Sequence, residues 1–162
     1  MDNRRDALKQ LFTVPAAAVL ASTVGTQPVN AVQIYNTSKG VKYAITKDLK
    51  KGAKETYPQP GDIVAVDFTG YKTNGQIFDA THSEGKSNAL LFKLGSGSVI
   101  PGFEDIVSQM VVGQKVQAII PPELAYGDKG VCLPDKPEEC LVKPGETLVY
   151  DILLVKASIP PP

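Results

Sequence analysis

The chain has 162 residues, and its 17 Lys and Arg balance 17 Asp and Glu, so the formal charge is zero. This length predicts one ordinary domain, or two at most. The even charge argues against a nucleic-acid-binding surface, and a hydrophobic content of 43% argues against a disordered chain. One His and two Cys offer little material for a zinc site, so we expect neither a metal nor a cofactor.

Residues 1–31 have the pattern of an export signal. The pair Arg4-Arg5 stands in a short charged opening, and the uncharged stretch Gln10–Val24 follows it. That stretch is too short and too mild to span a bilayer, and Val29-Asn30-Ala31 is a small-residue site of the kind that a signal peptidase accepts. The arginine pair resembles a twin-arginine signal. The alternative interpretation is an Ala-rich N-terminal helix that frays.

Short segments in which apolar and polar residues alternate predict strands through the rest of the chain. These segments are residues 41–46, 63–71, 77–78, 90–94, 115–120 and 147–156. Thr73-Asn74-Gly75 predicts a hairpin turn, because Asn-Gly suits turns that need positive φ. Residues 32–39 are expected to be a loose lead-in, and residues 123–146 a long loop.

One segment changes to a helical period. Phe103, Ile106, Val107 and Met110 fall on one stripe of a helix of about ten residues, and Pro101 suits its first turn. A single apolar stripe needs one concave sheet face to cover it. The sequence therefore predicts an α+β domain, with an antiparallel sheet of about five strands packed on one short helix.

Six motifs resemble those of the FKBP-type peptidyl-prolyl cis-trans isomerases, in the family's order and at its spacing. They are Val66-Asp67-Phe68-Thr69-Gly70, Gly75-Gln76-Ile77-Phe78-Asp79, Phe92-Lys93-Leu94-Gly95, Val99-Ile100-Pro101-Gly102-Phe103, Glu123-Leu124-Ala125-Tyr126-Gly127 and Leu148-Val149-Tyr150-Asp151. The resemblance implies a five-stranded antiparallel half-barrel wrapped around one short α-helix. It places the isomerase domain at residues 55–157, after an extension with the first strand (32–54) and before a Pro-rich tail (158–162).

Isomerising an X-Pro bond requires rotation about an amide with a barrier of about 18–20 kcal/mol, and no bond to the protein is needed. An apolar pocket that holds the proline ring and favours the twisted amide is sufficient. The resemblance implies that the pocket walls are Phe68, Phe78, Leu90, Val99, Ile100 and Tyr150, over a floor made by Phe103. From the residues alone, without the order of the motifs, ordinary core is the more favoured interpretation of most of these side chains.

Three polar groups would complete the pocket by resemblance. The Ile100 backbone N–H would bind a substrate carbonyl, and the Tyr126 hydroxyl would be a second donor. Asp79 would face the twisting amide as a catalytic group, together with Phe103 and Tyr126. A carboxylate directly after Ile77-Phe78 is costly on an apolar face unless it is paired or functional, although a plain turn cap also explains it.

Four positions depart from the usual family pattern. Phe103 stands where the family most often has Trp, Phe68 where it has Tyr, Tyr150 where it has Phe, and Leu90 where another aromatic is common. These changes keep the pocket apolar but alter its area and its polar partners. We therefore expect modest catalysis on standard proline peptides and weaker binding of the family's macrolide ligands.

The two cysteines, Cys132 and Cys140, lie eight positions apart in the expected long loop. An exported chain matures where disulfides persist, so we expect a bridge, and closing such a loop stabilises by about 2–3 kcal/mol on the chain-entropy model. Two unrelated buried thiols, or a metal pair with His82, are the alternatives. By resemblance the bridge pins the segment leading to Leu141, which overhangs the pocket, and redox control of activity becomes a hypothesis.

The sequence thus predicts a peptidyl-prolyl isomerase that acts on proline-containing client polypeptides as a monomer, with no nucleic acid and no stable membrane span. The rival function is a non-catalytic binding module that holds a partner during assembly. The cysteine-bearing insertion resembles thylakoid-lumen members of the family, so the expected compartment is the chloroplast thylakoid lumen. The bacterial periplasm is the alternative.

Overall fold

The computed structural model describes residues 31–82 and 88–159. Residues 1–30 of the predicted export signal and residues 160–162 of the tail lie outside the described residues. From Gln33 onward the chain forms one compact unit. Within the described ranges, no helix is long and apolar enough to cross a membrane.

In the part of the chain that the structure describes, seven strands form one antiparallel sheet. They are β1 (Ile34–Asn36), β2 (Lys42–Lys47), β3 (Ile63–Lys72), β4 (Ile77–Ala80), β5 (Leu90–Lys93), β6 (Lys115–Ile120) and β9 (Leu148–Ser158). The spatial order is β1-β2-β6-β9-β3-β4, and β5 also pairs with β3. The predicted α+β class, with a main antiparallel sheet packed on one short helix, is confirmed.

Strand β3 organises the sheet because its two edges have different neighbours. Strand β9 pairs along the whole of one edge. On the other edge β5 pairs with Ile63–Val66, and β4 pairs with Thr69–Tyr71. Asp67 and Phe68 therefore lie at a fork, between the end of one neighbouring strand and the start of the other.

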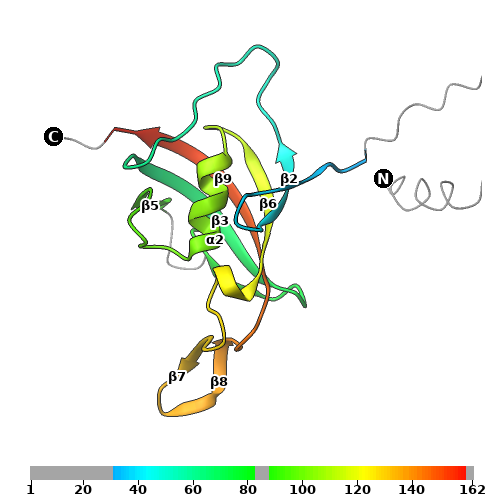
Figure 1. The fold of residues 1–162 in the computed structure, drawn as a ribbon, viewed down its shortest axis with the longest axis vertical. Coiled ribbons are helices and arrows are strands. Elements are labelled where there is room, and N and C mark those ends of the chain that lie inside the picture. Colours follow the sequence, from blue (N-terminus) through cyan, green and yellow to red (C-terminus); the bar gives the residue numbers. More distant parts are fainter. Residues whose placement is uncertain (1–30, 83–87, 160–162) are drawn as a thin grey trace, which may run out of the picture. The chain divides into compact units, whose positions relative to one another are not determined.

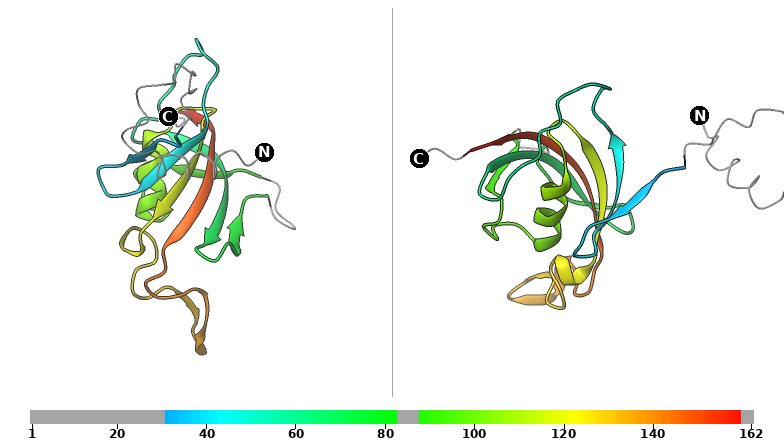
Figure 2. Two further views of the ribbon diagram at one scale, coloured as in Figure 1. Left: turned by 90° about the vertical axis from the view of Figure 1, so that its right-hand side faces the viewer. Right: turned by 45° about the horizontal axis from the view of Figure 1, so that its top comes forward.

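Helix α2 (Pro101–Gln109) crosses the concave face of this sheet, and the sheet curves around it (Figures 1 and 2). Pro101 occupies the first turn, where its missing N–H costs nothing. The predicted stripe is confirmed, because Phe103, Ile106 and Val107 are buried beneath the helix. Gly113, at φ 93°, turns the chain into β6.

The core lies between α2 and the concave face. On β6 the alternation Val116, Ala118 and Ile120 is fully buried, while the residues between them face solvent. Residues of β3 and β9 continue this layer; they are Val64, Val66, Leu148, Ile152 and Leu154. Each fully buried aliphatic side chain of this size contributes about 1.5–3 kcal/mol, so burial of the helix stripe is what holds α2 in place.

Two stretches predicted to lack regular structure are ordered. The lead-in contains β1, which pairs with Lys42–Ala44. The expected loop 123–146 contains a short 3₁₀ helix, η2 (Pro122–Leu124), and a hairpin of β7 (Val131–Leu133) and β8 (Lys136–Val142). These strands are short or highly charged, so no apolar period marks them. The sheet has seven strands instead of about five, and the strand that the sequence did not predict is β1 at its edge.

Candidate active site

A cavity of about 420 Å³ opens between α2 and the concave face of the sheet. Its lining comes from β3, β4, β5 and β9, from α2 and the segment before it, and from the segment after η2. The lining residues are Phe68, Asp79, Leu90, Ser98, Val99, Ile100, Phe103, Tyr126 and Tyr150. Eight of these nine residues are the ones that the sequence analysis selected. Strands far apart in the chain thus bring the predicted residues together around one hollow.

Three aromatic rings form the inner wall of the cavity. The centroid of Phe103 lies 5.3 Å from that of Phe68 and 5.3 Å from that of Tyr150, with interplanar angles of 75° and 76°. Such edge-to-face pairs are worth about 0.5–1.5 kcal/mol beyond their burial. Phe103 is 3% exposed, and Phe92 backs it at 6.1 Å. The floor is therefore held from both sides.

The polar groups of the cavity are concentrated around two tyrosine hydroxyls and one carboxylate. The hydroxyls of Tyr126 and Tyr150 lie close enough to interact with each other. Burial raises the pKa of both tyrosines above its ordinary value, and the nearby Asp79 carboxylate raises both further. Both hydroxyls therefore stay protonated at neutral pH. Tyr126 is 37% exposed, so its hydroxyl can serve as a donor to a bound molecule.

Ile100 supplies the backbone donor. Its carbonyl begins helix α2 by accepting the amides of Phe103 at 3.1 Å and Glu104 at 3.2 Å. Among the described residues, its own N–H has no hydrogen-bond acceptor. The Glu104 carboxylate also accepts the amide of Gly95 at 2.6 Å, which ties the preceding loop to the helix. The segment that carries the donor is thus fixed at both ends.

Two predicted site residues do not line the cavity. Phe78 packs behind the wall, with its ring 5.7 Å from Tyr150, and Gly70 leaves the space for both rings. A Cβ at Gly70 would come within 2.8 Å of the Phe78 ring. Leu141 is 52% exposed on β8, in a hairpin that projects away from the sheet (Figure 1), so the expectation that it overhangs the pocket is not supported.

Ser98 lines the cavity, and the sequence reasoning missed it. Its hydroxyl lies 2.9 Å from that of Ser96. A serine that directly follows the run Gly95-Ser96-Gly97 is typical of ordinary turn material. Its position directly before Val99 was the one signal that could have found it.

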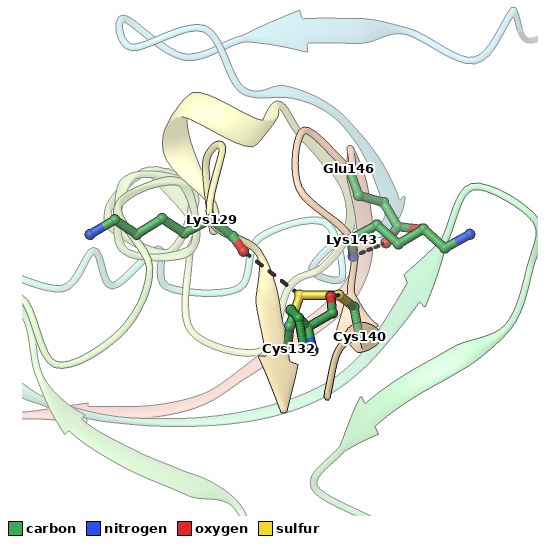
Figure 3. The surroundings of a disulfide bond; sticks show 6 residues. Lys129, Cys132, Cys140, Lys143 and Glu146 are labelled. Atoms are coloured by element: carbon green, nitrogen blue, oxygen red, sulfur yellow. Dashed lines mark hydrogen bonds between the residues drawn. A yellow bond between two sulfur atoms is a disulfide. The ribbon is translucent and has the colours of Figure 1, made fainter. Parts of the chain in front are cut away.

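Cys132 and Cys140 form the predicted disulfide across the β7–β8 hairpin (Figure 3), with an S–S distance of 2.01 Å. The two residues are also direct cross-strand partners. The base of the hairpin is tied to the cavity, because the Gly130 amide donates to the Tyr126 carbonyl at 3.0 Å. Gly130, at φ 63°, packs against the carbonyl of Val142, so no larger residue fits there. The bridge therefore stiffens the segment that follows Tyr126.

Reducing the disulfide is expected to lower the free energy of unfolding by about 2–3 kcal/mol, because the unfolded chain regains the entropy of the closed loop. Urea unfolding of oxidised and reduced protein measures the difference. Cys132→Ala/Cys140→Ala is the control, since reductant should not change its unfolding midpoint. Equal midpoints for the oxidised and reduced wild type, or two free thiols in mass spectrometry of the non-reduced protein, would contradict this prediction.

The comparison with known proteins agrees with this geometry. The model of one protein family, the FKBP-type peptidyl-prolyl cis-trans isomerases, matches residues 54–155, which include the whole cavity. The chain belongs to this family. As an FKBP it is a peptidyl-prolyl isomerase, and the fold and enzyme class predicted from the sequence are confirmed.

Individual relatives of this FKBP come from fungi, plants and bacteria. FK506-binding protein 2 of Candida glabrata is 37% identical over 119 residues, covering 73% of this chain and 81% of the relative. The chloroplastic isomerase FKBP13 of Arabidopsis thaliana is 37% identical over 98 residues, covering 57% of this chain and 45% of the relative.

Solved structures of FKBPs show the same fold. The crystal structure of AtFKBP13 superimposes with a TM-score of 0.65 and 29% identity, covering 78% of this chain and 99% of that one. FkpA of Escherichia coli gives a TM-score of 0.64 and 30% identity, covering 79% of this chain and 53% of that one.

Proposed function

We propose that the cavity over Phe103 is the isomerase site and that it accelerates cis–trans isomerisation of X-Pro bonds in client polypeptides. The observation that carries this proposal is the distribution of groups in the cavity. Aromatic and aliphatic side chains surround a volume of about 420 Å³, and the hydroxyl and carboxylate groups meet at Tyr126, Tyr150 and Asp79. A proline ring suits the apolar part, and its amide suits the polar part.

The chemistry follows from the amide itself. Rotation removes the conjugation of the C–N bond, so a site that binds the twisted amide better than the planar one lowers the barrier. The apolar walls exclude water, which otherwise stabilises the planar, more polar form. The Ile100 N–H holds a substrate carbonyl, and the Tyr126 hydroxyl donates a second hydrogen bond. Asp79 faces the rotating group and orients it by electrostatics.

Activity of the mature protein provides the direct test. A protease-free isomerisation assay on residues 32–162, which contain the compact unit from Gln33 onward, should show acceleration over the uncatalysed rate. Because Phe103 replaces the larger aromatic of the family pattern, we expect this activity to be modest and the binding of FK506-type macrolides to be weaker than usual. No acceleration at any enzyme concentration would overturn the proposed activity of this cavity.

A non-catalytic binding module that holds a partner during assembly is the second candidate function. The altered floor and wall residues favour it, since they change the surface that meets the proline ring. A Phe103→Trp variant separates the two functions. If the cavity is catalytic, kcat/KM for isomerisation should rise about threefold to tenfold. A larger ring covers more of the proline, and each Å² of apolar surface buried is worth about 25 cal/mol. Phe92→Trp, just behind the floor, is the matched control and should give no gain.

Residues 1–31 are proposed to export the protein through a twin-arginine route, and the mature chain would begin at Val32. A chloroplastic relative and the exposed hairpin disulfide support the thylakoid lumen, and bacterial relatives support the periplasm as the alternative. In such a compartment the redox state of Cys132 and Cys140 would adjust activity through the hairpin base at Tyr126. Mass spectrometry of the exported protein tests the cleavage site.

A further inference from the structure

Thr81 occupies the fork at which β3 changes neighbours. Strand β4 ends at Ala80, and β5 begins only at Leu90. Between them, the edge of β3 at Phe68 would have no strand to pair with. Thr81 takes that place although it is outside both strands, and it is only 5% exposed. A buried polar side chain at this point needs partners, and its partners lead to the cavity.

The Thr81 residue holds both backbone groups of Phe68. Its amide donates to the Phe68 carbonyl at 3.0 Å, and its hydroxyl oxygen accepts the Phe68 amide at 3.1 Å. The side chain therefore replaces the hydrogen bond that the next residue of a strand would have made. Phe68 is the wall residue whose ring meets Phe103 and Tyr150.

Two side chains on the outer face of the sheet orient the hydroxyl of Thr81. Its oxygen lies 3.2 Å from Nδ1 of His82 and 3.4 Å from the carboxylate of Asp67. The same ring nitrogen of His82 lies 3.5 Å from that carboxylate. These groups form a polar cluster on the opposite side of β3 from the cavity, where Thr81 and Asp67 also line a second, smaller hollow of about 200 Å³. The hydroxyl proton has acceptors there, which leaves the oxygen lone pairs for Phe68.

The same residue fixes the end of the strand that carries Asp79. Asp79 pairs with Gly70, Ala80 pairs with Thr69, and Thr81 completes the series at Phe68. Asp79 and Thr81 are thus two positions apart on one short strand and its continuation. Loss of the last contact would free a strand of only four residues at its cavity end.

We infer that Thr81 is a positioning residue for prolyl isomerisation. It touches neither the cavity nor a bound substrate, and it acts by holding Phe68 and Asp79 at the distance that the twisted amide requires. This inference rests on the proposed function of the cavity. Small displacements of such groups are costly, since a shift of about 1 Å can lower a rate by about a hundredfold.

The test compares two matched substitutions in the full chain. Thr81→Val keeps the shape and removes the hydroxyl, and we expect kcat/KM for a proline peptide to fall about tenfold. Thr81→Ser restores the hydroxyl and should return kcat/KM to within about twofold of wild type. Thr69→Val makes the same chemical change one residue from Phe68, where the hydroxyl has no hydrogen bond with any described residue, and it should leave kcat/KM unchanged.

A double-mutant cycle distinguishes positioning from a general loss of stability. If Thr81 acts through Asp79 and Phe68, the effect of Thr81→Val should shrink to less than about twofold in an Asp79→Ala or a Phe68→Leu background. Equal effects in all backgrounds, or wild-type activity for Thr81→Val, would overturn the inference. If Thr81→Val does not fold, Thr81→Ala enters the same cycles.

The two cycles also keep this inference separate from the proposed function. If Asp79→Ala alone leaves kcat/KM unchanged, the role given to Asp79 fails, and the Phe68 cycle still decides the role of Thr81. If both single substitutions in the cavity lower kcat/KM but Thr81→Val is additive with them, the cavity assignment stands and Thr81 is not a positioning residue.

Discussion

Replacing Phe103 with Ala is expected to give a large combined loss of stability and activity. The ring is 3% exposed and meets Phe68, Phe92 and Tyr150, so its removal should lower the free energy of unfolding by about 3–5 kcal/mol. The cavity loses its floor at the same time. With less apolar surface against the proline ring, we expect kcat/KM to fall by about tenfold or more.

Two matched substitutions, Phe103→Leu and Phe92→Leu, separate the loss of stability from the loss of activity. Both rings are buried and their centroids lie 6.1 Å apart, but only Phe103 lines the cavity. Each substitution should lower the free energy of unfolding, measured in urea, by about 1–2 kcal/mol. Only Phe103→Leu should lower kcat/KM well below the wild-type value. Equal kinetic losses in both variants would mean that Phe103 acts as core alone and that the floor assignment is wrong.

A methyl group at Gly102 is expected to disturb the site through the position of α2. A Cβ there would overlap Cγ2 of Ile120 and would lie 3.0 Å from the carbonyl oxygen of Leu124. In a helix, Ala is about 1 kcal/mol more favourable than Gly. The steric conflict costs about 1–3 kcal/mol and pushes the helix away from β6. Because Phe103 follows this glycine directly and Ile100 lies two residues before it, kcat/KM should fall about tenfold in Gly102→Ala.

Ile120→Ala supplies the control for this steric argument. It removes the Cγ2 atom that the new methyl group would meet, at its own cost of about 2–5 kcal/mol. In that background Gly102→Ala should cost clearly less in urea unfolding, because only the contact with Leu124 remains. If Gly102→Ala costs as much with Ile120→Ala as without it, the close approach of α2 to β6 does not determine the effect.

The elements with a strong apolar period could be predicted from the sequence. The alternation on Lys115–Ile120 and the stripe of Phe103, Ile106 and Val107 each bury one face of a regular element, so the period reports the burial directly. Strand β1 and the β7–β8 hairpin could not be predicted in this way. Backbone pairing and a disulfide hold them, and neither produces a periodic pattern of apolar side chains.

In the candidate site, too, some residues could be predicted from the sequence and others could not. Phe68, Ile100, Phe103, Tyr126 and Tyr150 could be selected because their motifs stand in a recognisable order, and the structure brings them to one cavity. Leu141 was selected by the same resemblance, yet it lies exposed on a projecting hairpin. An ordered motif carries over only where the backbone around it follows the same path, and the hairpin path is set by its own disulfide.

By itself, the sequence determined the family, the α+β class and the apolar character of the pocket, and it made the pairing of the two cysteines an expectation. Those properties depend on residue type and order along the chain. Only the tertiary structure decided that Ser98 joins the cavity, that Phe78 stands behind its wall, and that Thr81 completes the edge of β3. These depend on where separate strands meet, because a hydrogen bond between Phe68 and Thr81 is specified by the fork in the sheet and by no local pattern.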